Sequence, residues 1–225
     1  NISVNAGQDI IQSANISANT SGKTIDLVAG RNITQAQTYS TTSTNGNILL
    51  QAGNNITIET VSAGSGNISV TATAGNIIDG DANGDSEIDI TAAGLKLTAG
   101  TGIGTGGNHI ETTVSTLTAS AGAGGLFVIE SDGLTVDTLS FDINRVSSTA
   151  STGPITSSQS NLTTSGGGHI ALVSTTGDLT ISDDVTAAGA GNILLKATAG
   201  AITQNNAIDG GSGNITILAS GAVSQ

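Results

Sequence analysis

The sequence predicts an all-β chain wound into a solenoid, and three observations lead to this fold class. A pattern of an apolar pair at positions i and i+2, a Gly-containing turn and a second apolar stretch occurs nine times in 225 residues. Most copies lie 20 to 23 residues apart. Within each copy apolar and polar residues alternate as in a β-strand, and no segment has the 3.6-residue period of a helix. Such a fixed period is typical of proteins that stack one coil on the next.

The apolar pair marks the first strand of each coil. Its two members face the same side of a strand, because side chains alternate between the two faces. The pairs are Ile2/Val4, Ile25/Leu27, Ile48/Leu50, Ile68/Val70, Ile88/Ile90, Leu126/Val128, Ile170/Leu172, Ile193/Leu195 and Ile215/Ile217. The intervals of 38 and 44 residues that precede Leu126 and Ile170 are about double the others, and each is expected to hide one degenerate copy. We therefore predict about eleven coils of roughly 20–23 residues.

Two further strands are predicted in each coil. The second follows a glycine that supplies the backbone conformation of a tight corner. It is expected around Ile10, Ile33, Ile56, Ile77, Leu95, Leu134, Ile155, Leu179, Ile202 and Val223. A weaker third stretch occurs at Ile16, Tyr39, Val61, Val185 and Ile208. Three strands and three corners per coil predict a parallel β-helix of triangular cross-section with a narrow aliphatic core, in which corner Asn residues hydrogen-bond to the next coil.

The pattern covers the whole chain, with one departure. It is already present at Ile2 and continues to Val223, so residues 1–225 are interpreted as a single β-helix segment and as an interior fragment of a longer chain. Residues 93–151 leave the register and include the Gly-rich stretch 100–107. We expect irregular coils with longer loops there, and no separate domain.

The composition excludes several classes of partner. Five Lys and Arg residues against seventeen Asp and Glu residues give a net charge of −12, which repels phosphate groups and argues against nucleic acid as a partner. No apolar run approaches the roughly 20 residues of a membrane-spanning helix, so we expect no membrane insertion in this segment. The absence of Cys rules out disulfides and is compatible with a long chain exported in an unfolded state.

The strongest chemical signal is the acidic segment 79–87. It matches the first half of a calcium-binding loop, in which alternate residues direct oxygen atoms to one centre and Gly84 permits a sharp bend. The candidate metal ligands are Asp79, Asp81, Asn83, Asp85 and Glu87. Ile90 stands where an EF-hand has its bidentate Glu, which excludes an EF-hand. A Ca²⁺ ion that joins two coils at a corner and a solvated acidic turn remain as the two interpretations.

An enzyme is the less favoured alternative. Some β-helical proteins cleave polysaccharides, and a carboxylate pair such as Asp183/Asp184, or a row formed by Glu130, Asp132 and Asp137, has the residue type that glycoside hydrolysis uses. However, the chain has no Trp and one Tyr to stack against sugar rings, and its basic residues are scattered singly. We therefore predict no catalytic residues and keep a carbohydrate-active or carbohydrate-binding β-helix as the alternative function.

Three segments carry a resemblance to a known family. Residues 47–57, 168–173 and 191–204, of which the last reads GNILLKATAGAITQ, resemble the repeats of filamentous-haemagglutinin-like bacterial exported proteins, and the likeness extends over nearly the whole chain. This resemblance implies a right-handed β-helical fibre at the bacterial cell surface, exported by two-partner or related secretion. It also implies a structural shaft of a surface filament or adhesin, with a host or neighbouring cell surface, or copies of the chain itself, as partners.

Overall fold

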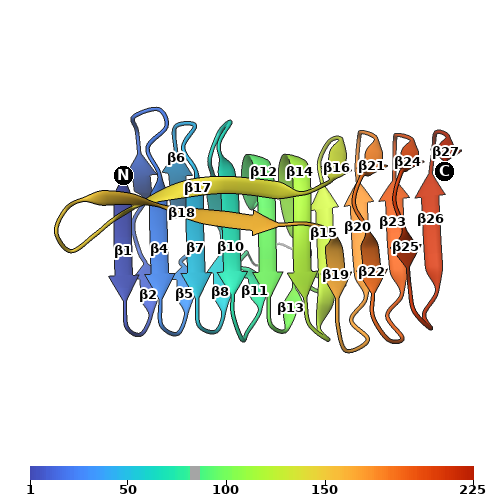
Figure 1. Cartoon of the computed structure of the whole chain (residues 1–225), viewed down its shortest axis with the longest axis horizontal. Coiled ribbons are helices and arrows are strands. Elements are labelled where there is room, and N and C mark those ends of the chain that lie inside the picture. The colour runs from blue at the N-terminus through green and yellow to red at the C-terminus, as the bar shows by residue number, and fades with distance from the viewer. Residues whose placement is uncertain (82–86) are drawn as a thin grey trace.

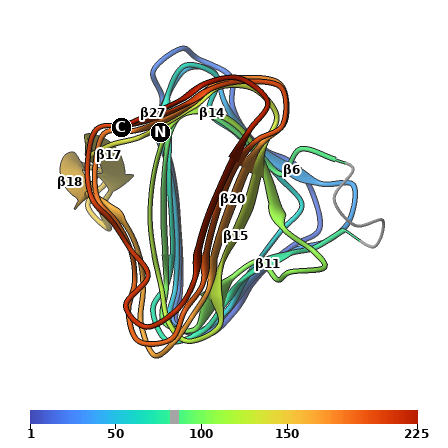
Figure 2. The same cartoon turned by 90° about the vertical axis from the view of Figure 1, so that its right-hand side faces the viewer.

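The chain forms a parallel β-solenoid of about nine turns, which confirms the predicted fold class. The computed structural model describes residues 1–81 and 87–225, and these contain strands and no helix. Figure 1 shows the strands stacked side by side from the N-terminal to the C-terminal end, and Figure 2 shows the closed cross-section along the stack. None of the described residues forms a helix long and apolar enough to cross a membrane.

The N-terminal coils contain three strands each, in the predicted order. The first three coils and the beginning of the fourth are built from β1 (Ile2–Ala6), β2 (Ile10–Gln12), β3 (Ile16–Ala18), β4 (Ile25–Ala29), β5 (Ile33–Gln35), β6 (Ser40–Ser43), β7 (Ile48–Ala52), β8 (Ile56–Ile58), β9 (Thr60–Ser62), β10 (Asn67–Ala72) and β11 (Ile77–Asp79). Each strand pairs in parallel with its equivalent one coil away, so that Ile2, Ile25, Ile48 and Ile68 form one continuous row. Ile25, Ile48 and Ile68 are fully buried, and Ile2 in the end coil is partly buried. Burial of each such side chain stabilises the fold by about 1.5–3 kcal/mol.

The corners are held together by side-chain oxygens that bind the backbone of the next coil. Asp9 Oδ1 accepts from the Asn32 backbone N–H, Asn32 Oδ1 from that of Asn55, and Asn55 Oδ1 from that of Asn76, at 2.8–3.1 Å. His169 takes the place of an Asn in the same role, because its Nδ1 accepts from the Asn192 N–H at 2.9 Å. The stacked Asn residues are therefore structural, as the sequence predicts.

The glycines of one corner row are required by crowding. Gly30 and Gly53 do not have positive φ angles, in contrast to the prediction from the sequence. A Cβ atom on Gly30 would lie 2.3 Å from the carbonyl oxygen of Gly7, and one on Gly53 would lie 2.2 Å from that of Gly30. Glycine allows consecutive coils to approach closely at this corner.

In the middle of the stack, the long aliphatic strands move from one face to another. The faces are numbered by the order of the strands in an N-terminal coil, so that β7, β8 and β9 lie on the first, second and third face. β12 (Ile90–Ala99) begins beside β9 on the third face and continues beside β10 on the first face. β14 (Ile110–Ala121) pairs with β12 in register. β15 (Gly125–Glu130) then pairs with β13 (Gly102–Ile103), which pairs with β11 on the second face. From there on the long strands span the second and third faces, because residues 128–130 of β15 pair with residues 110–112 of β14.

The C-terminal coils keep this shifted arrangement. Their long strands are β15, β20 (Ile170–Ser174), β23 (Ile193–Ala197) and β26 (Ile215–Ala219). The shorter strands form two columns, which continue from the middle of β14 at residues 116–117 and from its end at residues 119–121. These strands are β16 (Leu134–Val136), β19 (Leu162–Thr164), β21 (Leu179–Ile181), β22 (Val185–Ala187), β24 (Ile202–Gln204), β25 (Ile208–Asp209) and β27 (Val223–Ser224).

Two assignments from the sequence are wrong because of this shift. Ile90 pairs with Val61 on the third face and Ile88 is exposed, so the first strand of that coil begins near Leu95, which pairs with Ile68. The predicted eleven coils are too many, because β15 pairs directly with β20 and no hidden copy lies between them. Many of the residues between β15 and β20 lie outside the stack of coils.

These extra residues form an antiparallel hairpin of β17 (Leu139–Val146) and β18 (Thr152–Gln159). It lies along the outside of β1, β4, β7, β10 and β12 (Figure 1). The sequence predicts a second strand of a coil around Ile155, and this prediction is wrong because Ile155 belongs to the hairpin. The segment 93–151, predicted to be irregular, holds most of β12, all of β14 and all of β17.

The hairpin is fastened by apolar and ionic contacts. Phe141 and Ile143 are buried against Leu49, which points away from the solenoid core. Arg145 binds both carboxylate oxygens of Asp26, and Asp26 is 1% exposed although its strand position faces outward. The hairpin therefore covers the outer face of the first coils, and we call it the strap.

Candidate functional site

The acidic segment predicted to bind metal lies at the corner between the second and third faces. Asp79 ends β11 and is buried, Asp81 is half-buried and Glu87 is exposed. The other two candidate ligands, Asn83 and Asp85, lie outside the described residues. Asp79 pairs with Ile58 of the preceding coil, so its carboxylate occupies a position that is aliphatic one coil earlier.

The structure brings Asp79 together with two acids that the sequence analysis does not select. Asp89 immediately precedes β12, and Glu111 is the second residue of β14 in the next coil. One oxygen of each carboxylate lies within 4.8 Å of the other two, and the three residues are 5%, 0% and 3% exposed. We call Asp79, Asp89 and Glu111 the buried acid cluster. A signal for it is present in the sequence, because Asp89 and Glu111 are 22 residues apart and each precedes a strand core.

The hydrogen bonds around the cluster satisfy only part of its oxygens. Asp89 Oδ2 accepts from the Glu111 backbone N–H at 3.0 Å, and Asp79 Oδ1 accepts from the Asp81 N–H at 3.0 Å. Asp79 Oδ2 and Asp89 Oδ1 are buried and accept no hydrogen bond within residues 1–81 and 87–225. A buried oxygen without a donor is energetically costly, so the geometry favours a further positive or donor group at this place.

The electrostatics of the cluster also favour a bound positive group. Burial raises the pKa of Asp79, and the charge of Asp81 adds to this effect. Burial also raises the pKa of Asp89, where the charges of Asp79 and Asp81 contribute and the Glu111 N–H acts in the opposite direction. The cluster therefore disfavours three negative charges without a compensating cation.

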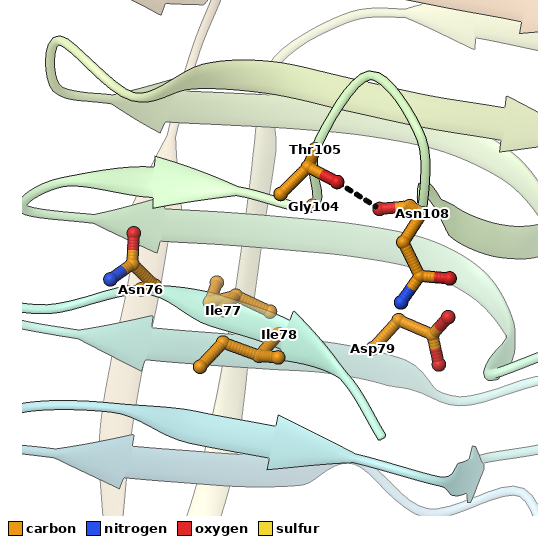
Figure 3. Close-up of a pocket in the computed structure, with 7 residues that line it drawn as sticks. All are labelled: Asn76, Ile77, Ile78, Asp79, Gly104, Thr105 and Asn108. Carbon is orange, nitrogen blue, oxygen red and sulfur yellow. Dashed lines mark hydrogen bonds between the residues drawn. The ribbon is translucent and has the colours of Figure 1, made fainter. Parts of the chain in front are cut away.

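A half-open cavity of about 320 Å³ gives access to Asp79. Figure 3 shows the side chain of Asn108 directed toward the Asp79 carboxylate from the turn that follows Gly104. Ile77, Ile78 and Thr105 also line this cavity. The cavity provides a route by which a small ion reaches the buried acid cluster from solvent.

Asp81 and Glu87 line a second cavity. They line a cavity of about 190 Å³ with Glu59, Gln37, Thr38 and Thr60 of the preceding coils. The described ligands of the predicted metal site are thus divided between two cavities, with Asp79 in one and Asp81 and Glu87 in the other.

The arrangement of three buried carboxylates can hold a metal ion. Carboxylate oxygens are ligands that hard cations such as Ca²⁺ and Mg²⁺ prefer, and the cluster contains no sulfur or imidazole ligand. This result agrees with the predicted cofactor in its ligand type and in one residue, Asp79.

The carboxylates considered for glycoside cleavage have hydrogen bonds to the coils. Glu130 is fully buried and accepts from Thr112 Oγ1 at 2.6 Å and from the Val114 N–H at 3.1 Å. Asp183 Oδ2 accepts from Thr138 Oγ1 at 2.7 Å, and Asp184 Oδ1 accepts from the Ala207 N–H at 3.2 Å. These contacts give the three side chains a structural role at the corners.

Glu130 is expected to make the fold less stable as the pH rises. Burial raises its pKa from 4.5 to about 7, so between these values the folded state binds the proton more tightly than the unfolded state, and stability falls as pH increases. Between these pH values the wild type should lose on the order of 3 kcal/mol of unfolding free energy through Glu130, and Glu130→Gln should not show this loss. Denaturant unfolding at pH 4 and pH 8 measures this difference, with the exposed Asp137→Asn as control. Parallel pH profiles for wild type and Glu130→Gln would contradict this assignment.

Comparison with known proteins identifies no relative. No protein-family model, no curated protein and no solved structure matches this chain. The fold and the buried acid cluster are therefore established from the chain itself, as a β-solenoid of about nine turns with a place for a metal ion.

Proposed function

We propose that this chain is a shaft segment of an extracellular bacterial surface filament or adhesin, a rigid rod that holds other parts of the molecule away from the cell. The observation that carries this proposal is the continuous parallel pairing from β1 to β27 around one aliphatic core. Apart from the strap, each coil pairs with its neighbours along the stack, so the fold extends in one dimension by adding coils. About nine turns at roughly 4.8 Å each give a rod of about 40 Å.

Three further features support a mechanical role. The strap fastens the first five coils to one another from outside. The backbone groups of successive coils are paired along the rod axis, which resists bending and local opening. The net charge of −12 keeps rods apart in solution and suits an exposed surface.

The resemblance to filamentous-haemagglutinin-like repeats supports a position of this shaft on the outside of the cell. On this proposal the partners are a host or neighbouring cell surface, or other copies of the chain in a filament. Export as an unfolded chain is compatible with a protein that has no Cys.

Immuno-electron microscopy of intact cells of the source organism tests the proposal. Antibodies raised against residues 1–225 are expected to label the surface of unpermeabilised cells, along projecting rods. Labelling that appears only after permeabilisation would contradict an extracellular shaft. A control antibody against a cytoplasmic protein reports whether the cells are intact.

A further inference from the structure

We propose that Asp79, Asp89 and Glu111 form a Ca²⁺ site that joins two consecutive coils where the long strands begin to change face. The geometry of the described residues supports this proposal. It goes beyond the shaft function, because the site acts on the stability of the rod wherever the rod is displayed.

The first observation is the convergence of three carboxylates from three elements. Asp79 comes from the end of β11, Asp89 from the residue before β12 and Glu111 from β14, and their ligand oxygens lie within 4.8 Å of one another. Two ligands on opposite sides of a Ca²⁺ ion, at about 2.4 Å each, are separated by about 4.8 Å. One ion therefore fits among the three oxygens.

The second observation concerns two buried atoms. Asp79 Oδ2 and Asp89 Oδ1 accept no hydrogen bond within the described parts of the chain, and both residues are more than nine-tenths buried. Two buried acids outside the cluster, Asp26 and Glu130, have both oxygens engaged, by Arg145 and by Thr112 and Val114 respectively. The buried oxygens of Asp79 and Asp89 therefore lack a donor, and a bound cation would satisfy both of them.

The ligand chemistry selects Ca²⁺ among common cations. The three carboxylates are hard oxygen ligands, and Ca²⁺ accepts irregular coordination by six to eight oxygens. Mg²⁺ requires near-octahedral geometry at about 2.0–2.1 Å and retains several of its water molecules. A buried cluster of three carboxylates therefore suits Mg²⁺ less well than Ca²⁺. Zn²⁺ prefers nitrogen and sulfur ligands, which this set does not include.

The position of the site gives the ion a structural effect. β12 and β14 both run across a corner without a break, and Asp89 and Glu111 lie at their beginnings, in register with each other. Asp79 ends the strand that leads into the acidic segment. An ion bound here connects the end of β11 to the beginnings of β12 and β14.

Thermal unfolding and calorimetric titration of residues 1–225 with CaCl₂ test the site. With a dissociation constant on the order of 10⁻⁴ M, 10 mM Ca²⁺ should raise the melting temperature by about 5–10 °C relative to EDTA. Titration should give one Ca²⁺ per chain, and 10 mM Mg²⁺ should produce less than half of the shift.

Matched variants assign the response to the buried acid cluster. Asp89→Asn keeps an oxygen for the Glu111 N–H and removes one charge, and Glu111→Gln is a second variant of the same kind. Both are expected to lose the Ca²⁺-dependent shift and to melt at or above the wild-type temperature in EDTA, because repulsion among the carboxylates is reduced. Asp137→Asn, an exposed residue with the same change of charge, should respond to Ca²⁺ as the wild type does.

Three outcomes would overturn the proposal. They are no binding heat and no shift for the wild type, an unchanged Ca²⁺ response in both cluster variants, and an equal response to Mg²⁺. The second outcome would locate the ion elsewhere on the acidic surface. If one variant loses its β-sheet circular dichroism signal, the other decides the assignment, and Asp79→Asn serves as a third. None of these outcomes depends on surface labelling of cells, so the shaft proposal stands or fails separately.

Discussion

Replacing Ile33 with Asp is expected to lower the free energy of unfolding by more than about 4 kcal/mol. Ile33 is 0% exposed and lies in the aliphatic column between Ile10 and Ile56 of the adjacent coils. A carboxylate at this position replaces an aliphatic side chain between Ile10 and Ile56, which offer it no hydrogen-bond donor, and these neighbours lose their contacts with Ile33 as well. Because each coil is stabilised by its neighbours, the coils on both sides should open together with it.

The neighbouring residue provides a matched control. Thr34 follows Ile33 in β5 but points to solvent, so Thr34→Asp introduces the same side chain outside the column. This variant should change stability by less than about 1 kcal/mol. Urea unfolding followed by circular dichroism compares the two. Similar stabilities for Ile33→Asp and Thr34→Asp would contradict the assignment of inward and outward positions.

Replacing Arg145 with Met is expected to release the strap and to cost about 3 kcal/mol. The guanidinium binds both oxygens of Asp26, at 2.5 and 2.9 Å, and Asp26 is 1% exposed. Met keeps most of the apolar length of Arg but leaves the Asp26 carboxylate buried without its cation. The energetic effect comes mainly from this stranded charge.

The double variant Arg145→Met/Asp26→Leu distinguishes the charge effect from lost packing. It removes both charges and should recover at least half of the stability lost in Arg145→Met. As a control, Arg31→Met interrupts an exposed ion pair with Asp9 and should leave the stability nearly unchanged, because solvent screens this pair. If Arg145→Met is as mild as Arg31→Met, the strap does not stabilise the first coils through this pair.

The fold class follows from local sequence because each coil repeats the same physical requirement. Ile10, Ile33 and Ile56 must fill one narrow column, so the same residue type recurs at nearly fixed spacing. Corner residues such as Asn32 and Asn55 recur for a similar reason, since each caps a backbone N–H of the next coil. These signals are present in every copy and allow the solenoid to be predicted.

The change of face cannot be predicted in the same way. Leu126 and Val128 form the same alternating pair as Ile48 and Leu50, and the pair itself contains no information about which face it stacks on. The strap cannot be predicted from the sequence for a related reason. Phe141 and Ile143 alternate as in any coil strand, although they pack against the outer face of the stack. Both features depend on contacts between distant segments.

The candidate site is only partly visible in the sequence. Asp79 belongs to a dense acidic segment and attracts attention, whereas Asp89 and Glu111 are single acids beside aliphatic residues. They meet Asp79 because the stack places residues one coil apart next to each other. Knowledge of the coil register is therefore required before the cluster can be found.

Distances between spin labels test the stacking of coils most directly, and the chain has no native Cys to interfere. Thr34, Thr57 and Thr216 point outward on the second face, and the strand pairing places Thr216 seven coils from Thr34 and six from Thr57. Labelled Cys pairs at 34/216 and 57/216 should give distances of about 34 Å and 29 Å. The difference should be one coil spacing, about 5 Å, although the positions lie 23 residues apart. Equal distances for the two pairs, or a change unrelated to the number of coils, would contradict the parallel solenoid on which the proposed shaft and Ca²⁺ site depend.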